Sequence, residues 1–255
     1  NGPIDILYAG CGPFATILLP LLGRFNPDEL TVHLLDIHQR SLDSVALIIK
    51  HCGLQTHRIS YLQDDACNYQ HPNNPHVIIA ETMQKSLEQE PQFAVTANLA
   101  PQLQAQGIFI PQKVEVALCL AKLDDETAAF RRGDTLDPNA LVEAGNRYPL
   151  ATVFCLTPED AQRLQQQASQ TDHGFLELSP VHVTIPVTAH LEDFDAVLFT
   201  RIQAFEQHRL LDYEAEITLP LRCNELMPLH AEDRYRISLQ IGPYPKFSVT
   251  RIRDD

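Results

Sequence analysis

Short apolar runs alternate with amphipathic segments over the first 120 residues, and this alternation constrains the fold more than any other feature of the chain. The apolar runs predict strands, and apolar positions at helical spacing, such as Leu42, Val45 and Ile49, predict helices between them. The expected strands are 4–9, 31–37, 58–62, 76–80 and 108–120, and the expected helices are 14–25, 41–52 and 93–106. Strands that alternate with helices form a parallel sheet with helices on both faces, so we expect an α/β domain.

The pattern changes after residue 123. Residues 124–149 are polar, and a helix is expected from Thr157-Pro158 to about residue 170. Beyond Phe175, apolar and polar residues alternate in the ranges 181–187, 213–219 and 235–241, which predicts antiparallel strands with one buried face. We therefore expect a Rossmann-like sheet in 1–123, a helical and polar connecting segment in 124–174, and an antiparallel β-barrel or sandwich in 175–255.

Charge and cysteine content exclude several classes of protein. The 255 residues carry 19 Lys and Arg against 33 Asp and Glu, a formal net charge of −14, which argues against nonspecific binding to nucleic acid or to anionic membranes. No apolar stretch is long enough to span a bilayer. Six scattered cysteines without a C-x-x-C pair, and no signal peptide, indicate a reduced, cytoplasmic protein.

Two further expectations come from single features of the sequence. The histidines include no H-x-x-x-H helix pair with a nearby acid, so we expect no metal site. The first strand begins at residue 4, whereas most folds of this kind have an element before it, so we expect the native protein to extend before Asn1.

Residues at the carboxyl ends of the strands are the candidate site, because ligands of open parallel sheets bind outside these ends. Strand one ends in Gly10-Cys11-Gly12. Glycine there permits a sharp turn and lets the backbone approach a ligand closely, although a tight turn alone would also use it. Cys11 is interpreted as a small buried residue of this loop and not as a nucleophile.

The next two strands end in acids. Asp36, followed by Ile37, stands 24 residues after Gly12. An acid at this distance can accept hydrogen bonds from both ribose hydroxyls of a nucleoside, and the alternative is a solvated loop carboxylate. Asp65 and Ala66 follow strand three, where an acid can receive the exocyclic amine of adenine or can simply belong to a loop.

Two glutamates follow strand four. Glu81 ends the strand, and Glu90 comes nine residues later. Two carboxylates in one pocket repel each other unless a cation lies between them, and a planar guanidinium suits such a pair. Alternatively, Glu90 only begins the following helix, where negative charge is favourable.

The motifs GCGP, LLDI, DDA and IIAE occur here in the order typical of class I S-adenosylmethionine-dependent methyltransferases, which the sequence resembles. It resembles the protein arginine methyltransferases more closely. That family has a loop of the form E-x-M…E, here Glu81-Thr82-Met83…Glu90, followed by L…G…IP, here Leu103, Gly107 and Ile110-Pro111. The family also has a C-terminal β-barrel. The resemblance covers residues 4–123 by motif and 175–255 by pattern.

Four departures from the family separate this chain from its pattern. Tyr8 stands where an acid usually precedes the first glycine, and Phe14 replaces the third glycine. The N-terminal helix that covers the cofactor is absent from this chain. The Thr-His-Trp loop is not recognisable, and its nearest candidate is His230.

The resemblance implies an enzyme, an S-adenosylmethionine-dependent N-methyltransferase that acts on a guanidino or amino group and has S-adenosyl-L-methionine as its cofactor. Catalysis would fall to Glu81 and Glu90. The implied cofactor-binding residues are Gly10, Cys11, Gly12, Asp36, Ile37, Asp65, Ala66 and Glu81. The partner would be a small molecule or peptide with a basic nitrogen, and a homodimer is expected because family members often dimerise.

Three alternatives remain at this point. The same cofactor could serve another small-molecule acceptor, including an oxygen nucleophile. The chain could be a non-catalytic methyltransferase-like scaffold that binds a partner. A dinucleotide-dependent oxidoreductase would share the glycine turn and Asp36, but not Asp65 or the two glutamates.

Overall fold

The computed structural model describes residues 2–171, 175–242 and 244–253, which form two compact units. The first unit consists of Asn1–Thr82, Gln92–Pro111 and Pro158–Gln162, and the second of Met83–Pro91, Gln112–Thr157 and Arg163–Asp255. Residues 112–123, which we expected in the first domain, fold with the second unit. The other domain limits stay predictions.

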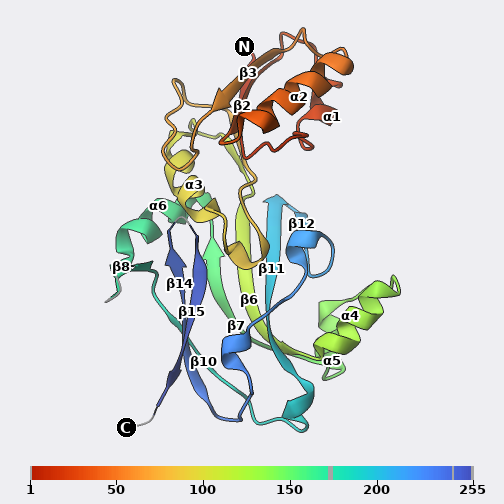
Figure 1. Cartoon of the computed structure of the whole chain (residues 1–255), viewed down its shortest axis with the longest axis vertical. Coiled ribbons are helices and arrows are strands. Elements are labelled where there is room, and N and C mark those ends of the chain that lie inside the picture. The colour runs from red at the N-terminus through yellow and green to blue at the C-terminus, as the bar shows by residue number, and fades with distance from the viewer. Residues whose placement is uncertain (1, 172–174, 243, 254–255) are drawn as a thin grey trace. The chain divides into compact units, whose positions relative to one another are not determined.

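The first unit is built on a five-stranded parallel sheet with the order β3-β2-β1-β4-β5 (Figure 1). Its strands are β1 (Ile4–Ala9), β2 (Leu30–Asp36), β3 (Arg58–Gln63), β4 (Val77–Ala80) and β5 (Ile108–Ile110). The Rossmann-like α/β sheet expected from the sequence is therefore confirmed. The strand order reverses between β1 and β4, which makes the carboxyl ends of these two strands the switch point of the sheet.

Helices cover both faces of this sheet, as the apolar pattern requires. Helices α1 (Leu19–Leu22) and α2 (Gln39–His51) pack on the face that carries Ile6, Tyr8 and Leu34 (Figure 1). Helix α3 (Gln92–Leu99), continued by η2 (Ala100–Gln102), packs on the face that carries Leu7, Ala9 and Leu35. Because both faces are buried, these strands contain nearly continuous apolar runs.

Prolines explain where the expected elements of the first unit are wrong. The helix expected at 14–25 shrinks to α1, because Pro20 is favourable only in the first turn of a helix. The strand expected at 108–120 is two strands in different sheets, β5 and β6 (Lys113–Ala121). Pro111 lies between them and has no N–H to donate to a ladder.

The second unit contains two antiparallel sheets. Strands β12-β11-β6-β7 form one, with β13 beside β11, and β10-β14-β9-β8 form the other, with β15 beside β14. The remaining strands are β7 (Arg147–Leu156), β8 (Ser169–Gln170), β9 (Leu176–Glu177), β10 (Val181–Thr184), β11 (Asp195–Phe205), β12 (His208–Leu210), β13 (Leu221–Arg222), β14 (Arg234–Ile241) and β15 (Lys246–Ile252). The expected antiparallel domain is confirmed as two sheets, and their pairings do not close into a barrel within the described residues.

The helices of the second unit are short. They are α4 (Leu123–Arg131) and α5 (Pro138–Glu143), with the single turns η1 (Lys85–Leu87), η3 (Leu191–Asp193), η4 (Glu216–Thr218) and η5 (Asn224–Leu226). Helix α6 (Pro158–Gln167) begins in the first unit and ends in the second. No helix in the described part of the chain has both the length and the apolar character needed to cross a membrane.

The strand expected at 213–219 is wrong, because this segment contains η4. Tyr213 adopts a φ of 68° and its hydroxyl donates to Glu126 over 2.8 Å, so its backbone turns away from an extended conformation. The Thr218 hydroxyl then accepts from the Ala215 N–H at 3.0 Å and closes the turn.

A buried group of charged side chains connects α4, β7 and β11 in the second unit. The Arg147 guanidinium donates through Nε and Nη2 to both carboxylate oxygens of Glu126, at 3.1 and 2.6 Å, and through Nη1 to Asp212. Arg201 donates to the same Asp212 at 2.8 and 3.1 Å. The side chains of Arg147, Glu126 and Asp212 are at most 1% exposed, so these three charges neutralise each other out of water, and Arg201, 31% exposed, adds a second cation from the rim of the group.

Candidate functional site

The loop after β1 runs through two glycines that have different reasons to lack a side chain. Gly10 has a φ of 74°, and a Cβ there would lie 2.4 Å from the Glu81 carbonyl oxygen. Gly12 has a φ of 58°, and a Cβ there would meet nothing within 4 Å. Gly10 therefore lets the ends of β1 and β4 approach closely, whereas Gly12 leaves open backbone at the switch point of the sheet.

Asp36, at the end of β2, holds this loop. Its Oδ2 accepts from the Gly12 N–H at 2.9 Å, and its Oδ1 accepts from the His38 N–H at 2.8 Å. The residue is 8% exposed. Each carboxylate oxygen has a second lone pair, so Asp36 can fix the loop and still accept a hydrogen bond from a hydroxyl group.

Cys11 lies between the two glycines and is buried. Burial, together with the neighbouring Asp36 carboxylate, raises the pKa of its thiol to about 12. A thiol with this pKa stays protonated and is a poor nucleophile. The structure therefore agrees with the interpretation of Cys11 as a small buried residue of the loop.

Tyr8 and Glu81 join the two strands at the switch point. Tyr8 is fully buried on β1, and its hydroxyl donates to Oε2 of Glu81, the exposed residue that follows β4. Burial and the adjacent carboxylate raise the pKa of Tyr8 far above its usual value, so the phenol keeps its proton and remains a donor. The sequence does not predict this partnership, because Tyr8, which replaces the usual acid, meets Glu81 only through the register of β1 and β4.

The end of β4 is also held from α3. The Thr82 N–H and hydroxyl both donate to Oε1 of Gln92, at 3.0 and 2.8 Å, and Gln92 is fully buried. The position of Glu81 is thus fixed from Tyr8 on one strand and through its neighbour Thr82 from the first turn of a helix.

Asp65 and Ala66 shape the turn after β3. The Asp65 carboxylate accepts from the Cys67 N–H and from the Asn68 side chain, both at 2.9 Å, and the residue is exposed. Ala66 packs in the core, and its carbonyl oxygen accepts from Asn98 at 2.9 Å. Ile37 is 58% exposed beside Asp36 and leaves an apolar side chain at this edge of the sheet.

Glu90 belongs to the second unit, whereas Glu81 belongs to the first. Glu90 accepts from the Gln84 side chain at 2.9 Å, within the same segment of residues 83–91. The convergence of the two glutamates on one substrate stays a prediction. His230, the nearest candidate for the Thr-His-Trp histidine, is exposed, and its role also stays a prediction.

The second unit holds the segment around Glu90 by backbone contacts. The Ser86 N–H donates to Thr200 Oγ1 at 2.7 Å, and the Phe247 N–H donates to Glu88 Oε1 at 3.1 Å. Ser86, Leu87 and Gln89 all have positive φ values, between 58° and 66°. Such conformations cost about 1–3 kcal/mol each and persist where surrounding contacts fix them, often at functional sites.

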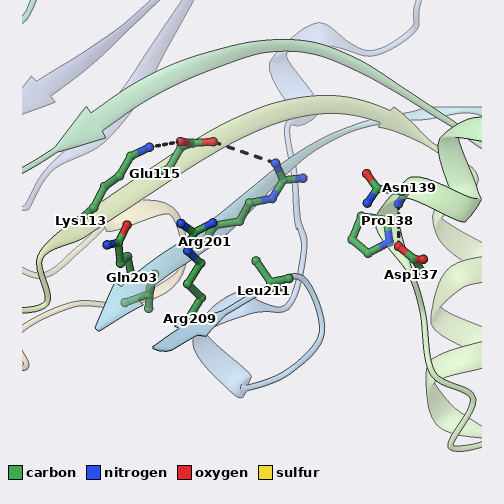
Figure 2. Close-up of a pocket in the computed structure, with 10 residues that line it drawn as sticks. Lys113, Glu115, Asp137, Pro138, Asn139, Arg201, Gln203, Arg209 and Leu211 are labelled. Carbon is green, nitrogen blue, oxygen red and sulfur yellow. Dashed lines mark hydrogen bonds and ion pairs between the residues drawn. The ribbon is translucent and has the colours of Figure 1, made fainter. Parts of the chain in front are cut away.

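A pocket with a volume of about 370 Å³ lies in the second unit, between β6, β11, β12 and the start of α5. Figure 2 shows Lys113 and Arg201 both reaching toward Glu115 on this wall, at 2.6 and 4.0 Å. Arg201 is also paired with Asp212. Lys113 and Arg201 are thus paired with carboxylates, and the two acids of the pocket are themselves engaged, Glu115 with these cations and Asp137 with the Asn139 N–H.

Comparison with known proteins shows which solved structures have a similar fold. No family model matches the chain, and a search of curated proteins by sequence finds no match. Among solved structures, the Trypanosoma brucei PRMT1 enzyme–prozyme heterotetrameric complex with AdoHcy matches with a TM-score of 0.52 at 13% identity, over 99% of this chain and 90% of that chain. Protein arginine methyltransferase 10 of Arabidopsis thaliana, in an open conformation, matches with a TM-score of 0.51 at 11% identity, over 94% and 79% of the two chains.

A third match is the crystal structure of PRMT6 with SAH, with a TM-score of 0.56 at 11% identity, over 98% of this chain and 92% of that chain. The fold is therefore that of the protein arginine methyltransferase structures, and the resemblance seen in the sequence is confirmed at the level of the fold.

Proposed function

We propose that this chain is an S-adenosylmethionine-dependent N-methyltransferase that acts on a guanidino or amino group. The observation that carries the proposal is the hydrogen bond between the Gly12 N–H and Asp36, which brings a glycine loop and an acid together at the switch point. The likeness to arginine methyltransferase structures solved with AdoHcy or SAH supports the same cofactor.

The residues at this edge fit such a cofactor. Gly12 offers backbone without a side chain in open space, which suits the amino acid end of the cofactor. Asp36 retains lone pairs for the ribose hydroxyls, and Asp65 with Ala66 lies at the end of the third strand, where adenine would bind. S-adenosylmethionine would supply a methyl group on a sulfonium. A nitrogen lone pair would attack that methyl carbon in line with the C–S bond, which breaks and releases the neutral thioether.

Glu81 has the acceptor role in this proposal. Its Oε2 is held by the Tyr8 hydroxyl, and the exposed carboxylate can accept N–H groups of a guanidinium or amine. Glu90 would supply the second carboxylate. Holding the nitrogen in line with the methyl group removes orientational freedom, and one carboxylate would take the proton as the product forms.

The acceptor class follows from charge. Carboxylates bind cations, and the chain carries a net charge of −14, so a small molecule or peptide with a basic nitrogen is the proposed partner. A homodimer and a cytoplasmic location are also part of the proposal. Light scattering on the purified chain tests the first, and fractionation of the native cells tests the second.

Labelled S-adenosylmethionine, incubated with the chain and a panel of guanidino, amino and hydroxyl acceptors, tests the activity by mass spectrometry of the products. We expect methyl transfer to a guanidino or amino compound. Transfer only to oxygen acceptors would select the alternative acceptor class. Thermal stabilisation by the cofactor without any transfer would select a non-catalytic scaffold, and stabilisation by NAD alone would contradict the cofactor.

Two variants test the acceptor-binding and the cofactor-binding parts of the site independently. Glu81→Gln should abolish turnover and leave cofactor affinity within a few-fold, with Glu143→Gln, an exposed residue of α5, as the matched control. Asp36→Ala should weaken cofactor binding at least about tenfold, or 1.4 kcal/mol, in a calorimetric titration. Undiminished turnover of the first variant, or unchanged affinity of the second, would contradict the assigned roles.

A further inference from the structure

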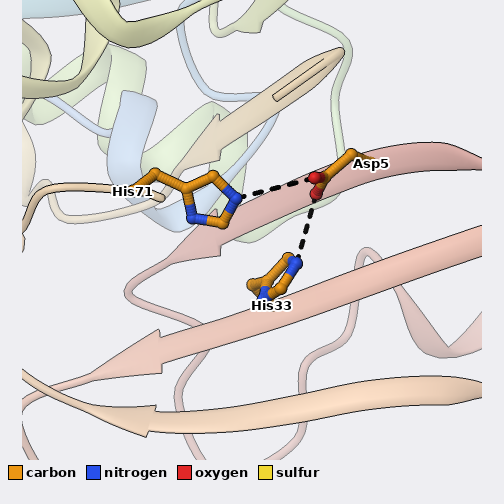
Figure 3. A group of neighbouring side chains, drawn as sticks. All are labelled: Asp5, His33 and His71. Carbon is orange, nitrogen blue, oxygen red and sulfur yellow. Dashed lines mark ion pairs between the residues drawn. The ribbon is translucent and has the colours of Figure 1, made fainter. Parts of the chain in front are cut away.

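Three titratable side chains meet in the first unit, far along the strands from the candidate cofactor edge. Asp5 lies on β1, five residues before Gly10, His33 lies on β2, and His71 follows β3. The register pairs Asp5 with Thr31 and Leu7 with His33, which puts Asp5 and His33 on the same face of the sheet. Figure 3 shows the imidazoles of His33 and His71 both facing the Asp5 carboxylate.

The distances between the three groups are short but do not give hydrogen bonds. Nε2 of His33 lies 3.3 Å from Oδ1 of Asp5, and Nε2 of His71 lies 3.6 Å from Oδ2. The His71 side chain is fully buried, and those of Asp5 and His33 are each 17% exposed. Oδ1 of Asp5 and Nε2 of His71 are buried without a hydrogen-bond partner among the described residues, which is costly unless another group binds there.

Neighbouring residues hold the His71 ring and the backbone of the cluster. The Tyr69 hydroxyl lies 3.2 Å from Nδ1 of His71, so the other nitrogen, Nε2, is left facing Asp5. The backbone N–H of His71 donates to Oε1 of Gln102 at 2.8 Å, and the backbone N–H of Asp5 donates to Nδ1 of His76 at 3.1 Å. A side-chain partner such as the Tyr69 hydroxyl fixes ring orientation and tautomer around metal-binding histidines.

We propose that Asp5, His33 and His71 bind a divalent metal ion of the zinc type, with solvent as the fourth ligand. Two imidazole nitrogens and a carboxylate oxygen form a ligand set that zinc uses in proteins. The ligand atoms all lie within 4.8 Å of one another. Tetrahedral zinc, with bonds of about 2.0–2.1 Å, separates its ligand atoms by about 3.3 Å, close to the two nitrogen–oxygen distances of 3.3 and 3.6 Å.

The ion would join β1, β2 and the segment after β3, at a place where Oδ1 of Asp5 and Nε2 of His71 lack hydrogen-bond partners among the described residues. The expectation of no metal site rested on histidine pairs within one helix. Here the ligands come from three separate elements, which only the register of the strands brings together. The site is independent of the proposed methyl transfer, because Asp5 and His33 lie away from the carboxyl ends of the strands.

Calorimetric titration of the chelator-treated full chain with zinc chloride tests the site. We expect saturable binding of one ion per chain, and His33→Ala and His71→Ala should each weaken it at least about 100-fold. Tyr69→Phe should weaken it about 10-fold, because it removes only a partner of a ligand. His51→Ala, which removes an exposed histidine of α2, is the matched control and should change nothing.

Cobalt(II) gives a second readout that needs no variant. Bound to the unmodified chain, it should produce the intense visible bands of a tetrahedral site, and zinc should abolish them. Absence of saturable zinc binding, affinities equal in the ligand variants and the His51 control, or the weak spectrum of octahedral cobalt would each overturn the proposal. Circular dichroism of every variant ensures that a loss of binding is not a loss of folding.

Discussion

Replacement of Arg147 by methionine should destabilise the second unit more than any surface substitution. Among the described residues, the change leaves Glu126 with only the Tyr213 hydroxyl as a partner and Asp212 with only Arg201, while both carboxylates stay buried. Breaking a buried ion pair by removing one partner costs about 3–5 kcal/mol. This is a large part of the roughly 5–15 kcal/mol that stabilises an ordinary domain.

The double variant Arg147→Met with Glu126→Leu measures how much the interaction between these two side chains contributes to stability. It removes both charges and leaves the Tyr213 hydroxyl unpaired, which costs about 1–3 kcal/mol. The double variant should therefore be more stable than Arg147→Met alone by about 2 kcal/mol. Arg132→Met is the matched control, because Arg132 and its partner Asp134 are 65% and 51% exposed and such pairs contribute about 0–1 kcal/mol.

Equilibrium unfolding in urea, followed by far-ultraviolet circular dichroism, measures these differences, since the chain has no tryptophan to report by fluorescence. The reasoning predicts a lower midpoint for Arg147→Met and partial recovery in the double variant. If Arg147→Met unfolds at the same urea concentration as Arg132→Met, the buried group does not stabilise the unit. The single variant Glu126→Leu completes the cycle. If the effects of Arg147→Met and Glu126→Leu on the free energy of unfolding simply add in the double variant, the two residues are not coupled.

Two further predictions concern the loop after β1. Gly10→Ala should cost at least about 2 kcal/mol, because a left-handed φ costs about 1–2 kcal/mol and the new Cβ also meets the Glu81 carbonyl oxygen. Gly12→Ala should lower the free energy of unfolding only by the cost of the left-handed φ. Equal urea midpoints for the Gly10→Ala and Gly12→Ala variants would contradict this difference. Cys11 should resist iodoacetamide at pH 8 in the folded chain while the exposed Cys52 reacts, as mass spectrometry of the alkylated peptides can measure. Since folding raises the pKa of Cys11 from 9.0 to about 12, its contribution to stability is lost as the pH rises through this interval, and Cys11→Ala should flatten that decline.

The parallel sheet and the residues at its carboxyl edge could both be predicted from the sequence. Leu42, Val45 and Ile49 recur at helical spacing, so they lie on one face of α2, and all three are buried as expected. The meeting of Gly12 and Asp36 follows from the rule that parallel strands end at one edge.

Other features depend on partners far away in the chain. Tyr213 was expected in a strand because of alternation, but its hydroxyl binds Glu126, 87 residues earlier, and no local pattern carries that information. Tyr8 and Glu81 meet because Tyr8 pairs with Ile79 in the ladder, a register that sequence alone does not give. The same holds for Asp5, His33 and His71.

The division of the chain into interleaved segments has a consequence for the order of folding during synthesis. The first unit includes Pro158–Gln162, although its sheet is complete in sequence at Ile110. Ala161, in that late segment, is fully buried in the finished protein. A ribosome that has made the five parallel strands must therefore add about fifty more residues before α6 can dock, and the partly covered unit stays open to chaperones and proteases during that interval.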